Sequence, residues 1–268
     1  MTNKSTSNAP KGIYLLPNLL TTAGLFSGFY AIVSSMNGKF EAAAIAIFVA
    51  MIFDGLDGRV ARMTNTQSSF GAEYDSMADM VSFGMAPALV IYNWGLSSLG
   101  KFGWLAAFIF VACAALRLAR FNTQVGTADK RYFQGLASPA AAAVIAALVW
   151  TGVEFDINGH DFNIFLAPLT VVVGLLMVSN FRYSSFKEIE WKGKVSFVVI
   201  LAMLLVFVFV AARPAEVLLV VFGLYAFSGP IITIKTVKKL KLEHVVGDDD
   251  ADFVDDEKKT NQSDGNKE

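Results

Sequence analysis

Long apolar stretches alternate with short polar ones along most of the chain. Spanning a bilayer takes a helix of about 20 mostly apolar residues. Eight segments approach that length, at residues 14–36, 40–58, 76–98, 103–121, 138–155, 162–179, 195–212 and 214–234. The polar stretches between them are too short to fold as a soluble domain. The pattern predicts an all-α protein, a polytopic bundle of about eight transmembrane helices.

The composition also favours a membrane protein over a soluble one. The 268 residues are 54% hydrophobic and 17% charged, with 23 phenylalanines and a mean hydropathy of +0.51. A soluble domain of this length carries more charge and shorter apolar runs. The polar residues 1–10 lack a signal-peptide cleavage pattern, so we expect the first apolar helix to remain as a span. Cys113 is the only cysteine, which excludes a disulfide within the chain.

Lysines and arginines predict the orientation in the membrane. With the N-terminus in the cytoplasm, all but three of the 22 basic residues fall in the two tails or in inward-facing loops. The exceptions are Lys39, Lys101 and Arg213. Because basic residues concentrate on the cytoplasmic side, an even number of spans places both termini there. Residues 242–268 are acidic and polar without an apolar face, which predicts a disordered tail.

One charged segment interrupts the apolar pattern, between the second and third predicted spans. It reads DGLDGRVARMTNTQSSFGAEYDSMAD and covers residues 54–79. Asp54 and Asp57 lie near the cytoplasmic end of the second span, and Asp75 and Asp79 enter the third at a similar depth. Each pair is three or four residues apart and therefore shares one helix face. We expect two antiparallel helices to bring these carboxylates together at the cytoplasmic interface.

The clustered aspartates predict a metal site. Like charges in a poorly hydrated place stay ionised only when cations neutralise them. Ligand sets made entirely of oxygen favour Mg²⁺ or Mn²⁺, or Ca²⁺, over zinc or copper. The two histidines, His160 and His244, fall in an external loop and in the tail, so neither is expected to be a ligand.

Glycines and arginines complete the predicted site. Each helical glycine costs about 1 kcal/mol, so Gly55, Gly58 and Gly71 suggest close approach of another helix or of a bulky ligand. Arg59 and Arg62 can hold phosphate oxygens through paired hydrogen bonds. Metal-binding carboxylates, arginines and glycines at headgroup depth predict phosphoryl transfer on a lipid. One carboxylate would act as general base for an attacking hydroxyl.

Three other interpretations compete with this one. An Asp–Arg cluster could simply end two helices, but two close acidic pairs exceed what a helix end needs. A cation or proton transporter would spread carboxylates near the bilayer midplane over several helices, whereas these lie at one interface. A structural membrane scaffold would need no group of acidic residues at all.

The charged segment resembles the motif of the CDP-alcohol phosphatidyltransferases. The pattern D-x2-D-G-x2-A-R-x8-G-x3-D-x3-D runs from Asp54 to Asp79 with every defining position filled, and the broader resemblance covers residues 12–182. It implies a dimeric membrane enzyme whose four motif aspartates bind two divalent metal ions. Asp79 would also be the general base. Because the family has a six-span core, residues 1–182 form that core and residues 183–241 a C-terminal transmembrane extension.

The resemblance also implies where a CDP-linked lipid binds. Its nucleotide would lie along one side of the motif, formed by Gly58, Ala61, Arg62 and Gly71. Asn18 and Thr21, near the start of the first span, could donate hydrogen bonds to the phosphates or the cytidine, or simply satisfy the helix start.

Several stretches resemble the members of the family that accept serine. They are residues 16–29, 79–88, 116–122 and 133–142. They imply transfer of the phosphatidyl group from CDP-diacylglycerol to the serine hydroxyl, with release of CMP. Arg117 and Arg120 share one helix face and offer cations to the serine carboxylate, although positive-inside anchoring explains either alone almost as well. Glycerol 3-phosphate, an inositol compound or choline stay open as acceptors.

Overall fold

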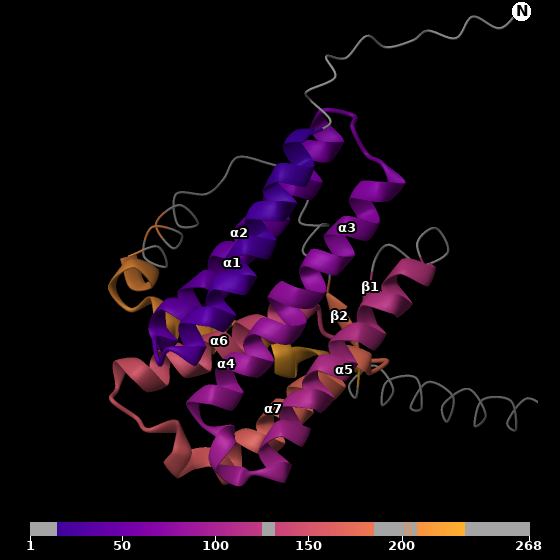
Figure 1. Ribbon diagram of the computed structural model, residues 1–268. Coiled ribbons are helices and arrows are strands. Elements are labelled where there is room, and N and C mark those ends of the chain that lie inside the picture. Colours follow the sequence, from indigo (N-terminus) through magenta and orange to yellow (C-terminus); the bar gives the residue numbers. More distant parts are fainter. Residues whose placement is uncertain (1–14, 125–131, 185–200, 202–203, 205–207, 234–268) are drawn as a thin grey trace, which may run out of the picture.

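The protein is a bundle of helices with one small sheet, seen in the computed structural model in Figure 1. The structure describes residues 15–124, 132–184, 201, 204 and 208–233. The labelled elements are α1 (Leu15–Met36), α2 (Phe40–Met63), α3 (Ser69–Asp79), the π-helix η1 (Met80–Met85), α4 (Ala86–Trp94), the 3₁₀ helix η2 (Leu96–Leu99), α5 (Lys101–Gln124), β1 (Tyr132–Gln134), α6 (Ser138–Glu154), the 3₁₀ helix η3 (Gly159–Phe162), α7 (Asn163–Val178) and β2 (Arg182–Ser184). A C-terminal helix, Pro214–Thr233, follows.

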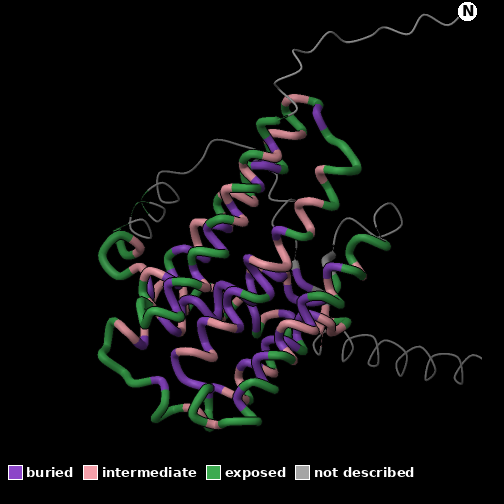
Figure 2. The backbone as a smooth tube through the Cα atoms, in the orientation of Figure 1, coloured by how far each residue is buried: buried purple, intermediate pink, exposed green. Residues whose placement is uncertain are grey.

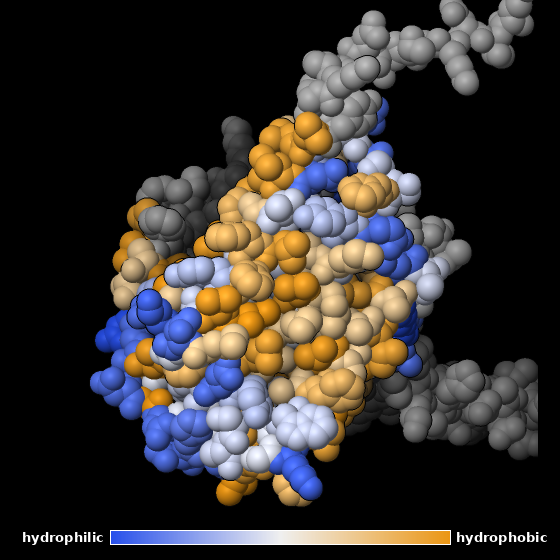
Figure 3. Space-filling view, viewed as in Figure 1, coloured by the Kyte–Doolittle hydropathy of each residue, from blue (hydrophilic) through white to orange (hydrophobic). Residues whose placement is uncertain are grey.

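The helices confirm an integral membrane protein. Within the described residues, four are long and apolar enough to cross a bilayer, namely Leu15–Met36, Lys101–Thr123, Gly159–Val178 and Pro214–Thr233. On the face shown in Figure 3, apolar side chains cover the middle of the bundle and hydrophilic ones gather toward its two ends. The predicted total of eight spans stays a prediction, because most of the segment 195–212 lies outside the described residues.

The bundle is built on antiparallel neighbours. Helices α1 and α2 lie side by side, and α3 leads back along α1 toward the middle of the bundle (Figure 1). Helix α5 packs along α7, and β1 pairs antiparallel with β2 so that Phe133 lies opposite Tyr183. The start of α1, the end of α2 and the start of α3 therefore meet at one end of the molecule (Figure 1).

Small side chains allow the core helices to approach closely. Buried residues gather around α4 and α6 in the middle of the bundle (Figure 2). Helix α6 buries a run of alanines, from Ala140 to Ala143 and again at Ala146 and Ala147. In a membrane, packing of this kind replaces much of the hydrophobic force that holds soluble cores together.

Helix α2 continues beyond the predicted end at residue 58 and stops at Met63. The chain turns there because Asn65 has a positive φ of 55°, which asparagine adopts more readily than most side chains. The amide of Asn65 donates to the carbonyl of Arg62 at 3.3 Å, and the amide of Thr66 donates to the carbonyl of Ala61 at 3.0 Å. These two hydrogen bonds form a Schellman motif, which satisfies the last carbonyl groups of the helix.

The third span was predicted as one helix over residues 76–98, and the structure corrects both its start and its regularity. Its helical segment begins at Ser69, where the Ser68 hydroxyl caps the helix by accepting a hydrogen bond from the Gly71 amide at 3.0 Å. The π-helix Met80–Met85 then interrupts it. The regular α-helix resumes at Ala86, and Pro87 lies in its first turn, where the missing amide hydrogen of proline is tolerated. Such π-turns are frequent at functional sites.

Helix α1 touches this π-turn with almost no space between them. The hydroxyl of Ser82 donates to the carbonyl of Gly24 at 3.1 Å. A Cβ atom added to Gly28 would lie 2.7 Å from the Cα of Ser82, closer than real Cβ contacts. Glycine at position 28 therefore lets α1 pack against the segment that follows Asp79.

We expect Gly28→Ala to destabilise the protein by about 1–3 kcal/mol, because the added methyl group overlaps the Ser82 backbone. Thermal unfolding in detergent measures the effect. Gly223→Ala is the control, since a Cβ there meets no atom within 4 Å; alanine should leave stability unchanged or raise it by up to about 1 kcal/mol. Equal unfolding midpoints for the two variants would contradict the close packing.

Candidate functional site

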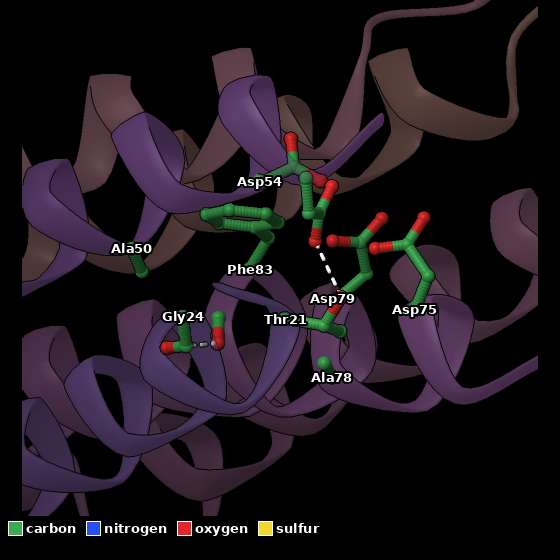
Figure 4. Close-up of a pocket in the computed structure, with 10 residues that line it drawn as sticks. Thr21, Gly24, Ala50, Asp54, Asp75, Ala78, Asp79 and Phe83 are labelled. Atoms are coloured by element: carbon green, nitrogen blue, oxygen red, sulfur yellow. Dashed lines mark hydrogen bonds between the residues drawn. The ribbon is translucent and has the colours of Figure 1, made fainter. Parts of the chain in front are cut away.

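Helices α2 and α3 bring the four motif aspartates together. Carboxylate oxygens of Asp54, Asp57 and Asp75 lie within 4.8 Å of one another. Asp79, at the end of α3, is within hydrogen-bonding reach of Asp54. Figure 4 shows Asp54, Asp75 and Asp79 turned toward a common space between the helices. The convergence expected from the spacing is therefore present in the structure.

The geometry of these aspartates fits a divalent metal ion. Hard cations bind oxygen at about 2.0–2.6 Å, so two ligands on opposite sides of one ion lie about 4–5 Å apart. The separation of up to 4.8 Å among the three carboxylates agrees with that distance. A gap of about 10 Å³ lies among the aspartates, which is close to the space of a single water-sized sphere. The donors are all oxygen, which suits Mg²⁺, Mn²⁺ or Ca²⁺.

Burial makes a cation at this place energetically favourable. Asp57 is only 4% exposed, and the other three side chains are partly buried beside it. Carboxylates repel one another strongly where water cannot screen them. A bound cation removes that repulsion, so the site favours metal binding on electrostatic grounds as well as on geometric ones.

Thr21 orients one of the aspartates. Its hydroxyl lies 2.6 Å from Oδ2 of Asp57, to which it donates (Figure 4). The same hydroxyl lies 3.1 Å from the Pro17 carbonyl. The sequence predicted contact between Thr21 and the phosphates or cytidine of a ligand. In the structure this hydroxyl donates to a carboxylate and fixes its direction, the kind of supporting hydrogen bond that metal sites commonly use. Its contact with a ligand stays a prediction.

A cavity of about 280 Å³ opens beside Asp57 and Asp75. All six residues predicted to bind a CDP-linked lipid line it, namely Asn18, Thr21, Gly58, Ala61, Arg62 and Gly71. Thr66, Gln67 and Ser68, from the link between α2 and α3, also line it. Sequence reasoning did not select these three, whose only signal was their place inside the motif. Residues from both helices of the motif therefore line the same cavity.

Two expectations about this region need correction. Arg59 is exposed and does not line the cavity, so Arg62 alone of the two arginines reaches it. Of the two roles predicted for Gly55 and Gly58, a close helix contact is wrong, because within the described part of the chain a Cβ atom on either meets nothing within 4 Å; close approach of a ligand stays a prediction. At Gly58 the missing side chain instead leaves room inside the cavity. Gly71 is packed more closely, because a Cβ atom added there would lie 3.1 Å from the Ser68 hydroxyl oxygen.

The two arginines of α5 have different surroundings. Arg117 lies within electrostatic range of Asp79 and Asp54, and its Nη1 donates to the Ser138 hydroxyl at 2.8 Å. Arg120 donates to Gln134 Oε1 and Asn180 Oδ1, both at 2.6 Å, and to the Val178 carbonyl at 3.3 Å. Arg117 therefore faces the aspartates, whereas Arg120 ties the end of α7 to the region of β1.

Ser138, Gln134 and Asn180 were not selected from the sequence as site residues. Two of them, Gln134 and Ser138, fall in the stretch 133–142 that resembles the serine-accepting members of the family. Their partners, Arg117 and Arg120, lie on α5. A local sequence pattern cannot reveal hydrogen bonds between residues this far apart in the chain.

Comparison with known proteins points to one family. The sequence pattern of the CDP-alcohol phosphatidyltransferases matches residues 14–178. A CDP-diacylglycerol–serine O-phosphatidyltransferase of Helicobacter pylori is 40% identical over 220 residues, which are 82% of this chain and 91% of the relative. A protein of the same name from Methanocaldococcus jannaschii is 43% identical over 140 residues, 52% of this chain and 62% of that protein. An archaetidylserine synthase of Methanothermobacter thermautotrophicus is 35% identical over 170 residues, 63% of this chain and 69% of the relative.

We expect Thr21→Val to weaken Mn²⁺ binding about tenfold, because the Asp57 carboxylate loses the donor that orients it. Titration of Mn²⁺ into the purified protein, followed by electron paramagnetic resonance, measures the affinity without any turnover. Thr22→Val is the matched control. Thr22 is exposed and its hydroxyl pairs with Tyr74 at 2.9 Å rather than with an aspartate, so its affinity should stay unchanged. Wild-type affinity in Thr21→Val would rule out the orienting role.

Proposed function

The chain belongs to the CDP-alcohol phosphatidyltransferase family, and we propose that it transfers the phosphatidyl group of CDP-diacylglycerol to the hydroxyl of L-serine. The products are phosphatidylserine and CMP. The observation that carries this proposal is the meeting of all four motif aspartates beside a cavity lined by the remaining motif residues. The names of the relatives supply the acceptor, since those at 34–43% identity are described as serine O-phosphatidyltransferases or archaetidylserine synthase.

The charges near the aspartates also favour serine over other acceptors. Serine carries one carboxylate, for which Arg117 is a suitable partner beside Asp79. Glycerol 3-phosphate or an inositol phosphate would need additional cations for a second phosphate. Arg120, the other candidate, already donates to three oxygens. Choline has no carboxylate and would make no use of Arg117.

Two divalent metal ions, Mg²⁺ or Mn²⁺, are part of the proposal. Asp54, Asp57, Asp75 and Asp79 would hold them, and the closeness of the first three supports this ligand set. The bound ions supply positive charge that stabilises the carboxylates and the phosphate oxygens of the substrate. Along the cavity, Asn18, Gly58, Ala61, Arg62 and Gly71 receive the nucleotide part of CDP-diacylglycerol, with Arg62 donating to phosphate oxygens.

Asp79 is the proposed general base. Its carboxylate takes the proton of the serine hydroxyl, and the serine oxygen attacks the phosphorus bonded to diacylglycerol. A new bond forms between that phosphorus and the serine oxygen as the bond to the CMP oxygen breaks, so CMP leaves with the electron pair. Arg117, in range of Asp79, would hold the serine carboxylate during this step.

The proposal places both termini and the aspartates on the cytoplasmic side of the cell membrane. Among the described basic residues, Arg59, Arg62, Arg117 and Arg120 lie on the parts of α2 and α5 nearest the aspartates, which agrees with the positive-inside rule.

We propose eight spans, with α2 and the segment α3–η1–α4 as the second and third. Residues 1–182 form the core and 183–241 the extension. The acidic tail 242–268 lies outside the described residues, and the homodimer is inferred from the family alone.

Membranes containing the protein should incorporate labelled serine into chloroform-soluble lipid when CDP-diacylglycerol is supplied. EDTA should abolish the reaction, and Mg²⁺ or Mn²⁺ should restore it while Zn²⁺ should not, because the proposed ligands are all carboxylates. Parallel assays with labelled glycerol 3-phosphate, inositol and choline control for the acceptor. Incorporation of one of these in place of serine would overturn the proposed substrate, and full activity without metal would overturn the site.

Asp79→Asn should lower the rate about 10²–10⁴-fold even at saturating Mn²⁺, because asparagine cannot accept the serine proton. Asp57→Asn is the matched control, since Asp57 is assigned only to metal binding. Its rate should recover at least in part as Mn²⁺ is raised. Rate measured against metal concentration for both variants distinguishes the two roles. If Asp79→Asn recovers as readily as Asp57→Asn, another group is the base.

A further inference from the structure

Two contacts fix the position of α5 along the segment that carries Asp79. Near the end of α5, the side-chain amide of Asn122 donates to the Ser76 hydroxyl on α3 at 3.0 Å. Further back along α5, Ala114 packs against the π-turn, because a Cβ atom added to Gly84 would lie 3.3 Å from the Ala114 Cβ. Over this stretch α5 therefore runs antiparallel to α3 and η1.

These contacts place Arg117 beside the metal site. On α5, Arg117 falls between the two contact points, and Asp79 falls between the matching points on α3 and η1. At a rise of about 1.5 Å per residue, Arg117 and Asp79 lie within about one helical turn of the same level. Arg117 is also three positions from Ala114, so it shares the face of α5 that contacts the π-turn. The arginine therefore belongs to the side of α5 that is nearest the aspartates.

The Ser138 hydroxyl holds the guanidinium of Arg117 from the interior of the bundle. Nη1 of Arg117 donates to Ser138 Oγ at 2.8 Å. Ser138, the first residue of α6, is fully buried, so its hydroxyl is out of reach of a ligand. A guanidinium has five N–H donors, so a hydrogen bond to Ser138 fixes its direction and leaves other donors for a carboxylate. Ser138 is thus placed to orient Arg117 and not to bind a substrate.

The chain before Ser138 is itself fixed against α5. It follows β1, which lies beside α5 in Figure 1, and Nη2 of Arg120 donates to Gln134 Oε1 at 2.6 Å. The Gly135 amide donates to the Phe181 carbonyl at 2.9 Å. Gly135 has a positive φ of 78°, a conformation that glycine adopts without strain, and this lets the chain turn from β1 toward α6. The position of Ser138 relative to α5 is therefore well defined.

We propose that Ser138 is a positioning residue, which directs the Arg117 guanidinium toward the carboxylate of the acceptor. This inference rests on the proposed transfer to serine, in which Arg117 receives that carboxylate. An arginine side chain has many rotamers, and holding it in one of them before the ligand arrives lowers the entropy lost on binding. The CDP-diacylglycerol side, around Arg62 and Gly71, lies on other helices and should be unaffected.

The first test is the kinetics of Ser138→Ala, which removes the oxygen that accepts from Arg117. The KM for serine should rise about tenfold, as expected when a charged group loses a hydrogen bond. The KM for CDP-diacylglycerol and kcat should stay within about twofold of wild type. Ser138→Cys fills the same space with a sulfur that accepts only weakly, so it should also raise the KM for serine. This second variant covers the case in which alanine disturbs the packing.

Ser35→Ala is the matched control. Ser35 is also buried and also accepts from a side-chain nitrogen of another helix, that of Asn93 on α4 at 3.0 Å. It lies about 21 Å further along α1 than Thr21, the residue that contacts Asp57. Both alanine variants should lower the thermal unfolding midpoint, because each removes the partner of a side chain on another helix. Only Ser138→Ala should change the KM for serine.

Ethanolamine distinguishes the carboxylate from the rest of the acceptor. It keeps the hydroxyl and the amine of serine and lacks the carboxylate. Its inhibition constant against serine should therefore be the same in the wild type and in Ser138→Ala.

A double-variant comparison tests whether Ser138 acts through Arg117. In an Arg117→Ala background, Ser138→Ala should cause no further rise in the KM for serine. An unchanged KM for serine in Ser138→Ala, an equal rise in Ser35→Ala, an equal loss of ethanolamine affinity, or a full effect in the Arg117→Ala background would each overturn the proposal. Failure of the wild-type protein to use serine would instead overturn the proposed function.

Discussion

Repulsion among buried carboxylates is the constraint on which this structure depends. Asp54, Asp57 and Asp75 offer oxygens within 4.8 Å of one another, and Asp79 lies beside them. Water screens them poorly, because the surrounding helices bury them in part or, for Asp57, almost completely. Such a group stays ionised only with cations bound, and the same cations would serve the proposed phosphoryl transfer. The repulsion that would otherwise destabilise the bundle is therefore what favours binding of a metal ion at this place.

The rest of the fold holds α2 and α3 at the distance that this site requires. A Schellman turn at Asn65 ends one helix and the Ser68 cap begins the next, so the link between them is short and well defined. Directly after Asp79 the chain enters a π-turn, where Ser82 packs against Gly24 and Gly28 of α1. Helix α1 in turn supplies Thr21 to Asp57. These contacts fix the positions of the helices that carry the aspartates. The packing of the core therefore determines the geometry of the site.

The two sides of the site differ in how they are built. The cavity side consists mainly of residues close together in sequence, on α2, α3 and the link between them, and α1 adds Pro17, Asn18 and Thr21. The opposite side is assembled from α5, the start of α6 and the end of α7, which meet around Arg117 and Arg120. A surface made from several distant segments can change without disturbing the metal-binding helices.

The sequence by itself determined the membrane class, the convergence of the four aspartates and the residues around the cavity. The first two follow from local rules, since apolar length predicts spans and spacings of three and four residues place side chains on one helix face. The resemblance to the family supplied most of the cavity residues that were predicted, and the link residues Thr66, Gln67 and Ser68 were not among them. The tertiary structure decided what depends on contacts between distant segments. It turned the Thr21 hydroxyl to Asp57, left Arg59 outside the cavity, and engaged Arg120 with Gln134 and Asn180. It also joined the Tyr183 hydroxyl to the Ala226 carbonyl. No periodicity encodes such pairings, because they arise only when helices far apart in the chain pack against one another.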